Sequence, residues 1–552
     1  MLNGNKLCVI TCVNDDGKYA EMLSSFRKML VPNNMIIEYV SMRGEKSIFE
    51  GYQKAMNSSD AKYKIYIHQD VIILDKKFLI NLLNLFVNNP QCGIAGVIGG
   101  HAFDDNGVWW NSELAGAIFD TNNYDQIPYE QRYYDKEVQN EFVAAIDGLL
   151  IATQYDINWR YDLFSGWHLY DVSQCLEFHR AGYTVGVVAQ PKTACLHKCG
   201  LVKLGNYDDV RKKILIEYDR EIKEINQKYR RYPLVTVLIP TYNRPYFLSM
   251  AIESVLAQTY PNIEIFISDN SPNEDTKKMM KQYLERYPNI KYEYHPEFDF
   301  FGNWNRLQEY DNPETEYINY LMDDDLFMPD KIEKMVIKFQ QNPDVSIVTS
   351  RRLFIDENND VLPSSNSEED VITEDTALSG DEVGKFFLLS MKNIIGEPTT
   401  ALIKKKKFGD CKLGWSGNEG RYMITDYPAW LKLLSNGKMI YLTEQLSCFR
   451  QHKNQDTHSS RSIMSVPVCY AIEIKYAWEN KKIITSDVEI ELCILNCIST
   501  ALTAIKQLKE IEYNQYSQDY FILKQLIKAM GDALLNSYNI DLSWLDTRIE
   551  KR

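Results

Sequence analysis

The chain has 552 residues, of which 45% are apolar, so it is long enough to build two or three domains with hydrophobic cores. Its 76 acidic residues outnumber 61 Lys and Arg, which gives a net charge of −15 and argues against a general nucleic-acid-binding protein. The 11 cysteines are scattered and form no Cys-x-x-Cys pair, so neither a disulfide framework nor a zinc cluster is predicted.

The sequence shows neither a targeting signal nor a membrane-spanning segment. The N-terminus lacks a cationic start followed by a long apolar core, so we expect no signal peptide. Nowhere does an apolar run approach the ~18 residues that a membrane helix needs. These features predict a cytoplasmic protein without a transmembrane segment, and they leave peripheral contact with the inner face of a membrane open.

Two segments of the chain begin in the same way, at Leu7–Asp16 and at Leu234–Arg244. Each is a β-branched apolar run that ends in a polar loop, and a helix, a second strand, another helix and an acid-terminated third strand follow. Strands that alternate with helices predict a mostly parallel sheet covered on both faces. The predicted fold class is α/β, with two Rossmann-like domains in tandem. Ligands of such sheets bind beyond the carboxyl ends of the strands, where the acidic residues lie.

The remaining segments are predicted to be helical. The segment between the two domains has apolar residues at helical spacing and is followed by Pro233: Leu215, Tyr218, Ile222, Ile225 and Tyr229. Apolar stripes after residue 461 are interpreted as packing faces of a helical appendix. The predicted organisation is a first domain over 1–205, a linker helix over 206–232, a second domain over 233–460 and a helical C-terminal region over 461–552.

Three chemically apt residues recur in both domains at a constant offset of 255 positions. In each domain an Asp at a strand end is followed after 101 residues by a second Asp, and after 26 more by a His: Asp70, Asp171 and His197; Asp325, Asp426 and His452. A single Asp of this kind could be a helix cap and a single His a core residue. The repeated triplet favours a functional site in both domains over that reading.

Adjacent carboxylates at the end of the second domain's third strand, Asp323, Asp324 and Asp325, predict a site for a hard divalent cation. Mg²⁺ and Mn²⁺ accept carboxylate oxygen and are typically bound by one or two carboxylates together with substrate phosphates. A His can complete the shell of Mn²⁺, and a further Asp outside the shell can act as a general base. The pattern predicts a metal that in turn binds a diphosphate.

Four motifs of the second domain occur in the order typical of family 2 glycosyltransferases with the GT-A fold: VTVLIPTYNRPYFLSMAIESVLAQTYPNIEIFISDNS, the Asp cluster, TDYPAWLKLLSNGKMIYLTEQL and FRQH. The resemblance covers roughly Pro233 to Lys453. The first domain, over roughly residues 5 to 200, resembles a divergent branch of the same superfamily through IHQDV, GWHLYD and LHKCG. The resemblance implies two GT-A domains, each of the nucleotide-diphospho-sugar transferase type.

For the second domain the resemblance implies a nucleotide-binding loop and a metal motif. The loop would be lined by Pro240, Thr241 and Tyr242, with Asn243 and Arg244 next to it, and Asp269 would accept a hydrogen bond from the base. Asp323 and Asp325 stand for the family's DxD motif. Asp324 can also be placed in that motif, and the internal repeat favours Asp325 as the principal ligand.

The resemblance also implies a base and a late ligand in the second domain. Asp426 occupies the position of the catalytic base, although the family usually has Glu-Asp where this chain has Thr425-Asp426. His452 matches the late His that contacts metal or diphosphate, and Arg450 is expected to assist.

In the first domain, the resemblance places Val13 and Asn14 in the nucleotide loop and Ser41 near the base. His68 and Asp70 replace the DxD motif, and Asp171 would be the catalytic base. His197 would be the late ligand, so the implied metal ligands are His68, Asp70 and His197. Because His68 stands where the family has an Asp, this domain has one hard anionic ligand fewer.

The resemblance therefore implies an inverting, metal-dependent glycosyltransferase that uses Mn²⁺ or Mg²⁺ and a nucleotide-sugar donor, with a UDP-sugar as the commonest expectation. The acceptor would be a hydroxyl of a glycan, a lipid-linked glycan or a protein such as flagellin. We expect two active sites; the alternative is one active second domain with an acceptor-binding or scaffolding first domain. A nucleotidyltransferase is disfavoured because its Gly-rich, Lys/Arg-containing loop is missing at Val13–Lys18 and Thr241–Tyr246. Sugar, acceptor and oligomeric state are left open.

Overall fold

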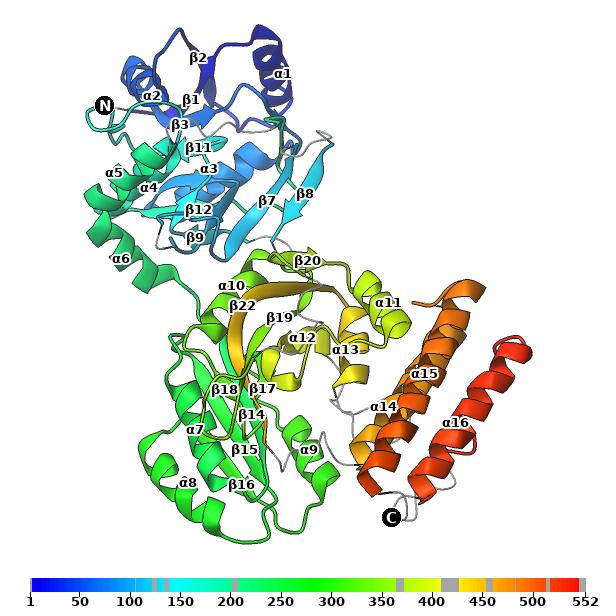
Figure 1. Ribbon diagram of the computed structural model, residues 1–552. Helices are drawn as coiled ribbons and strands as arrows, with labels where there is room; N and C mark the ends of the chain where they lie inside the picture. The colour runs from blue at the N-terminus through cyan, green and yellow to red at the C-terminus, as the bar shows by residue number, and fades with distance from the viewer. Residues whose placement is uncertain are drawn as a thin grey trace. The chain divides into compact units, whose positions relative to one another are not determined.

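The computed structural model describes residues 2–104, 106–121, 127–133, 139–200, 207–363, 372–408, 426–452, 460–481, 483–512 and 517–545 (Figure 1). The chain divides into two compact units, Met1–Arg231 and Tyr232–Arg552, called here unit 1 and unit 2.

Unit 1 is built on a seven-stranded sheet with the order β2-β1-β3-β11-β5-β12-β9. Its strands are β1 (Asn3–Val13), β2 (Ile36–Arg43), β3 (Ala61–Ile67), β5 (Cys92–Gly96), β9 (Glu141–Val143), β11 (Leu150–Thr153) and β12 (Thr184–Val187). Strands β1, β2 and β3 are mutually parallel, whereas β11 runs antiparallel between β3 and β5. A second sheet consists of β10 (Ala145–Ile146), β6 (Ile98–Gly100), β7 (Leu114–Asp120), β13 (Cys195–His197) and β4 (Val71–Ile73), with β8 (Tyr129–Arg132) beside β7.

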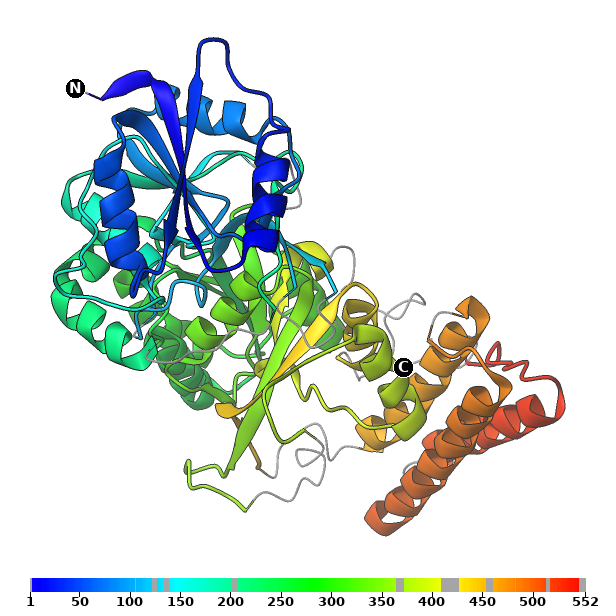
Figure 2. The same cartoon turned by 90° about the horizontal axis from the view of Figure 1, so that it is seen from above.

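Helices cover both faces of the main sheet of unit 1 (Figure 2). They are α1 (Asp16–Phe26), α2 (Ile48–Ser58), α3 (Phe78–Asn88) and α4 (Tyr170–Arg180). One apolar cluster joins the sheet to α2 and α4 through Phe49, Tyr52 and Phe178. A second cluster joins it to α1 and α3, for example through Phe26 and Leu79. The predicted parallel sheet with two covered faces is thus present.

The segment predicted as one linker helix is two helices, α5 (Tyr207–Glu217) and α6 (Asp219–Tyr229), and both pack on unit 1. Their shared break is at Tyr218, whose ring is fully buried and whose hydroxyl donates to Glu177. Arg160 and Arg180 each reach Glu217 at 3.1 Å and tie α5 to the body of the unit. Because the apolar stripe faces this core, the segment belongs structurally to unit 1.

Unit 2 has a nine-stranded sheet with the order β16-β15-β14-β17-β21-β19-β22-β18, and β20 pairs with β22. Its strands are β14 (Leu234–Thr241), β15 (Ile263–Asp269), β16 (Ile290–Tyr294), β17 (Thr315–Tyr320), β18 (Leu326–Phe327), β19 (Val345–Ile355), β20 (Thr376–Leu378), β21 (Leu402–Lys404) and β22 (Lys438–Arg450). Its helices before residue 460 are α7 (Pro245–Leu256), α8 (Asp275–Arg286), α9 (Phe300–Glu309), α10 (Lys331–Gln341), α11 (Gly380–Ser390), α12 (Lys405–Phe408) and α13 (Tyr427–Leu434), with a 3₁₀ turn, η2, at Pro398–Thr400.

The two units share one strand order although their sequences have diverged. The series β2-β1-β3-β11-β5-β12 in unit 1 corresponds to β15-β14-β17-β21-β19-β22 in unit 2. In both series the fourth strand is antiparallel to its two neighbours, and the last two strands are parallel to each other. The long β22 pairs with β19 along its whole length and, near its end, also with β18 on its other edge, so one strand does what β12 and β13 do separately in unit 1.

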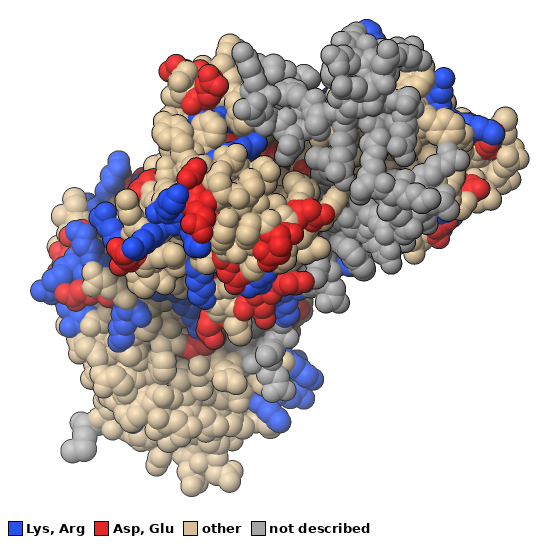
Figure 3. Space-filling model, turned by 90° about the horizontal axis from the view of Figure 1, so that it is seen from below, with Lys and Arg blue, Asp and Glu red and all other residues tan. Residues whose placement is uncertain are grey.

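The C-terminal region is helical, as expected: α14 (Ser460–Asn480), α15 (Asp487–Glu512) and α16 (Ser517–Leu535). The predicted stripe is buried at Ile494, Ala501 and Leu508, and it joins a cluster that includes Phe387 of α11 and Trp430 of α13. Among the described residues, Asp487–Leu508 is the one helical stretch whose length and composition would suffice to cross a membrane, and core helices of other proteins pass the same criterion. On the face in Figure 3, basic and acidic side chains are interspersed over part of the described surface, and a broad area of other residues adjoins them.

Candidate active sites

The carboxyl ends of the parallel strands of unit 2 bring the predicted nucleotide loop beside the Asp cluster. Strand register places Thr241 opposite Asp269, and Leu321 continues β17 by donating its N–H to Leu238 at 3.0 Å. The loop then begins α7, with Pro245 at its first helical turn, where a missing N–H costs nothing. Ligand sites of open α/β sheets form at this edge.

Asp323 and Asp324 converge on one guanidinium group. Nη1 of Arg244 lies 3.1 Å from Oδ1 of Asp323 and 3.0 Å from Oδ2 of Asp324. The other oxygen of Asp323 accepts from the Thr241 hydroxyl at 2.9 Å, and Asp324 pairs with Nε2 of His452 at 2.9 Å. Asp324 thus bridges Arg244 and His452, and Asp323 shares the same guanidinium group.

Asp325 faces the other way, into the protein. Its carboxylate accepts from the Thr399 hydroxyl at 2.6 Å and from the backbone N–H of Arg450 at 3.0 Å, and the residue is 1% exposed. Asp323 and Asp324 lie in a turn that the N–H of Asp325 closes by donating to the carbonyl of Met322 at 3.1 Å, and β18 begins directly after Asp325. The geometry therefore favours Asp324 over Asp325 as the partner of His452, whereas the repeat in the sequence favoured Asp325.

Burial and the neighbouring carboxylates raise the pKa of Asp323 and of Asp325. Burial, and then the charge of Asp324, raise the pKa of Asp323 to about 7. The same two causes, with Glu397 after them, raise the pKa of Asp325 well above its ordinary value. Buried like charges at this spacing favour either protons or a bound cation. The oxygen and imidazole donors fit Mn²⁺, and the carboxylates alone fit Mg²⁺.

The nucleotide loop of unit 2 is held by a short relay of hydrogen bonds. Asn243, at a positive φ of 56°, donates its N–H to the Ser271 hydroxyl at 2.7 Å, and Ser271 donates its own N–H to Asp269 at 2.8 Å. Asp269 also accepts from Tyr292 at 2.6 Å and is fully buried. This places Asp269 behind the loop, where it positions Asn243. Pro240 is partly buried, and Tyr242 is 55% exposed at the loop surface.

Asp426 lies at the N-terminus of α13. One of its carboxylate oxygens accepts from Nδ2 of Asn393 at 3.2 Å. Desolvation raises the pKa of Asp426 to about 6, and the charge of Glu397 contributes in the same direction. Thr425, the departure from the family pattern, lies outside the described residues.

The loop Asn393–Thr400 was missed by sequence reasoning although it touches both halves of this site. Asn393 binds Asp426, Thr399 binds Asp325, and Glu397 acts electrostatically on both aspartates. Glu397 is held by Arg352, whose Nε lies 3.2 Å from its carboxylate. The signal in the sequence is the polar turn GEPTT inside an otherwise apolar stretch, with Gly396 at a φ of 93° that excludes most other residues.

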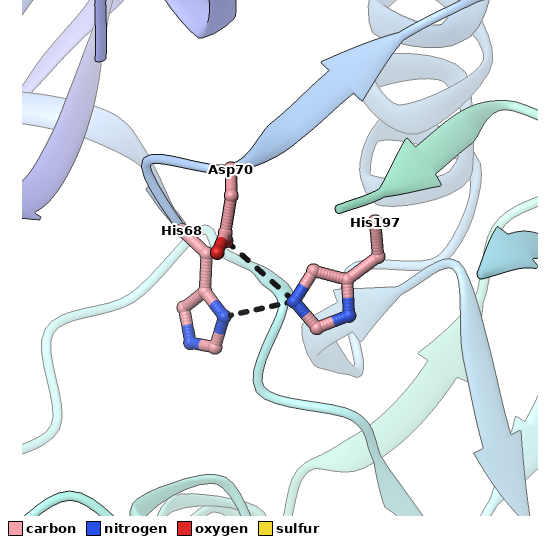
Figure 4. A group of neighbouring side chains, drawn as sticks. All are labelled: His68, Asp70 and His197. Atoms are coloured by element: carbon pink, nitrogen blue, oxygen red, sulfur yellow. Dashed lines mark hydrogen bonds and ion pairs between the residues drawn. The ribbon is translucent and has the colours of Figure 1, made fainter. Parts of the chain in front are cut away.

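Unit 1 brings His68, Asp70 and His197 together (Figure 4). Nε2 of His197 lies 3.5 Å from Nδ1 of His68 and 3.6 Å from Oδ1 of Asp70. Antiparallel pairing of β13 with β4, which sets His197 opposite Val71, brings these side chains into range. Lys18 of α1 reaches the other oxygen of Asp70 at 3.3 Å, and Tyr170 hydrogen-bonds His68 on the ring nitrogen away from His197. Two imidazoles and one carboxylate suit a transition metal better than Mg²⁺.

The other predicted residues of unit 1 lie around this group. Asp171, in the first turn of α4, accepts from the Gly148 N–H at 3.1 Å, and burial together with Asp147 raises its pKa to about 7. Asn14 donates its backbone N–H to Gln69 at 2.9 Å, beside buried Val13. Ser41 is exposed on β2, opposite Thr11 of β1.

Equal spacing in the sequence does not mean equal geometry. His197 is a strand residue in register with β4, whereas the partner of Leu326 across β18 and β22 is Cys448, four residues before His452. His452 instead lies beyond the end of β22. The same His-to-carboxylate contact is therefore reached at Asp70 in unit 1 and at Asp324, one position before its sequence counterpart, in unit 2.

Comparison with known proteins assigns both units to glycosyltransferases. Residues 8–218 match the model described as "Glycosyltransferase like family", and residues 236–411 match "Glycosyl transferase family 2". An uncharacterized glycosyltransferase of Methanocaldococcus jannaschii is 25% identical over 252 residues, which are 45% of this chain and 81% of that protein. The GalNAc(5)-diNAcBac-PP-undecaprenol beta-1,3-glucosyltransferase of Campylobacter jejuni is 28% identical over 106 residues, 19% of this chain and 34% of that protein.

Solved structures show weaker overall likeness. The structure of Staphylococcus aureus TarS in complex with UDP has a TM-score of 0.38 at 13% identity. The match covers 55% of this chain and 83% of the TarS chain. The mannosyltransferase PcManGT of Pyrobaculum calidifontis, in complex with GDP-Man and Mn²⁺, has a TM-score of 0.34 at 14% identity, covering 56% and 88%. The assignment rests on the two family matches, which together span well over half of the chain. The chain is a glycosyltransferase that belongs to family 2, with a divergent module of the same kind preceding the family 2 module.

Proposed function

We propose that unit 2 transfers a sugar from a nucleotide-diphosphate donor to an acceptor hydroxyl with inversion at the anomeric carbon. The observation that supports the proposal is a set of charged contacts beside the loop at residues 240–244, in which Arg244 pairs with Asp323 and Asp324, and Asp324 pairs with His452. Asp426 lies on a different element, at the start of α13. In this proposal the Asp cluster would face the leaving group and Asp426 would face the acceptor hydroxyl.

A divalent ion in unit 2 would be held by Asp323, Asp324 and His452. When bound, such an ion neutralises charge that develops on a leaving diphosphate. Asp325 would support the shell from behind, through Arg450 and Thr399. Arg244 already carries positive charge at this point, so it would move toward the diphosphate or share the carboxylates with the ion.

The proton of the acceptor hydroxyl would pass to Asp426. A free Asp, with a pKa near 3.9, is a weak base, whereas desolvation raises the pKa of Asp426 to about 6. A carboxylate whose pKa lies nearer the working pH accepts a proton more readily in the transition state. Asn393 donates to one oxygen of Asp426 and so restrains the orientation of the carboxylate.

Unit 1 would perform a second transfer with His68, Asp70 and His197 as its metal group and Asp171 as its base. Its pKa of about 7 makes Asp171 the stronger of the two bases. The rival proposal, a unit 1 that only binds acceptor, is favoured by one observation, His68 in place of a carboxylate. Acceptor classes in keeping with the family are a glycan, a lipid-linked glycan or a protein; we place the reaction in the cytoplasm or at the inner face of a membrane.

The test is a donor screen on the full-length protein with Mn²⁺ or Mg²⁺, in which nucleotide release and donor binding are both measured. Asp426→Asn should abolish transfer at unit 2 and leave donor binding intact, while Asp324→Ala should weaken metal-dependent donor binding. If Asp70→Ala and Asp171→Asn leave the length of the product unchanged, unit 1 is the acceptor-binding module. Loss of donor binding in Asp426→Asn would contradict the role of Asp426.

A further inference from the structure

A second group of ligand atoms adjoins the His68–Asp70–His197 group of unit 1. One ligand atom each from Asp120, His197 and Cys199 lies within 4.8 Å of the other two. The three residues offer an oxygen, a nitrogen and a sulfur, and each is partly exposed. The glycosyl-transfer proposal uses only His197 among them.

The backbone builds this group. Parallel pairing of β7 with β13 places His197 opposite Asp120, and the N–H of Thr121 donates to the carbonyl of His197 at 3.2 Å. Lys198 then donates its N–H to the carbonyl of Asp70 at 2.9 Å. This contact turns the chain so that Sγ of Cys199 reaches Oδ1 of Asp120 at 3.3 Å. Two hydrogen-bonded strands thus fix Asp120 and His197, and the contact of Lys198 with Asp70 holds the backbone next to Cys199.

We propose that unit 1 binds Zn²⁺, or a metal of the same class, through Asp120, His197 and Cys199. A thiolate is a soft ligand that selects Zn²⁺ over Mg²⁺ and Ca²⁺, and imidazole and carboxylate complete a common three-ligand set. Three protein ligands leave the fourth tetrahedral position open. Binding would release the thiol proton of Cys199, since the thiolate is the ligand.

Sharing of His197 links this site to the neighbouring group. A neutral imidazole has one nitrogen that can accept, because the other carries the proton. One His197 therefore serves one ion at a time. When His197 binds Zn²⁺ together with Asp120 and Cys199, it cannot bind an ion held by His68 and Asp70. The two metal-binding groups therefore compete for His197.

Cobalt substitution tests the site without any measurement of sugar transfer. Full-length protein stripped with chelator is titrated with Co²⁺, and a near-ultraviolet sulfur-to-cobalt charge-transfer band is sought. The band should appear, disappear on addition of Zn²⁺, and be absent in Cys199→Ser. Cys12→Ser, which changes a partly buried thiol on β1 of the same unit, should retain the band. No band in the wild-type protein, or an unchanged band in Cys199→Ser, would overturn the proposal.

Affinity separates a direct ligand from a supporting residue. Loss of a residue that only supports a ligand costs 10–100-fold in metal affinity, so Cys199→Ser should weaken Zn²⁺ binding by more than about 100-fold in calorimetry. Asp120→Asn should weaken it as well, and it provides a second variant if Cys199→Ser fails to fold by circular dichroism. Asp70→Ala should keep the cobalt band, because Asp70 belongs to the His68–Asp70–His197 group and not to the Asp120–His197–Cys199 group. A change of tenfold or less in both Cys199→Ser and Asp120→Asn would reject direct ligation.

Discussion

The two units have the same strand order and place acidic and imidazole side chains at corresponding strand ends, but the resulting sites differ. Unit 2 gathers carboxylates around Arg244, whereas unit 1 gathers two imidazoles and one carboxylate beside Lys18. Unit 2 fixes its late His beyond a long strand, and unit 1 fixes it within a short one. Both units therefore place charged and imidazole side chains at the same edge of the sheet, while the identity of those side chains differs between the units.

Removal of the proposed bases should have the largest effect on the rates of the two transfers. Asp426→Asn in unit 2 and Asp171→Asn in unit 1 should each lower the rate of one transfer by about 10²–10⁴-fold, the usual contribution of general base catalysis. Asn has the size of Asp, and its amide oxygen can still accept from Asn393 at position 426, so the fold should survive. The measurement is single-turnover transfer with each variant, with nucleotide-sugar affinity as the control. Equal loss of both transfers in either single variant would contradict two independent sites.

A pair of variants distinguishes Asp324 from Asp325 in unit 2. Asp324→Ala should remove most metal-dependent donor binding, because Asp324 joins Arg244 to His452. Asp325→Ala should instead lower the free energy of unfolding by about 1–3 kcal/mol, since it leaves the buried N–H of Arg450 unpaired. Calorimetric donor binding and denaturant unfolding measure the two effects. If Asp325→Ala loses binding and Asp324→Ala does not, the assignment made from the sequence repeat is the right one.

Sequence patterns predicted the layout better than the individual contacts. Apolar runs that end in polar residues identified β1, β14 and β17, and strand alternation with helices predicted the parallel sheet. The pattern did not resolve whether Asp324 or Asp325 faces the site, because three adjacent carboxylates carry no periodicity, and the choice depends on pairing with β22, more than a hundred residues away. Glu397 and Cys199 were missed for the same reason, since each reaches its site through contacts distant in sequence.

The pH dependence of the two transfers should differ by about one pH unit. A base works in its ionised form, so activity falls as pH drops through the pKa of the base. Burial raises the pKa of Asp171 to about 7 and that of Asp426 to about 6. The transfer left in Asp171→Asn should thus persist to lower pH than the transfer left in Asp426→Asn. Profiles of kcat for the two variants measure this, and coincident acidic limbs would show that the bases are not what limits both reactions.

Glu397→Gln should produce the smallest effect and locate its carboxylate in the working site. The charge of Glu397 raises the pKa of Asp426, so its removal should move the acidic limb of unit 2 to lower pH and leave unit 1 unchanged. Gln keeps the shape of the side chain, and its amide oxygen can still accept from Arg352, so the fold should hold. Arg352→Lys is the matched control, because it retains the charge beside Glu397. An acidic limb that stays in place in Glu397→Gln would mean that Glu397 supports the loop at Asn393–Thr400 without acting on Asp426.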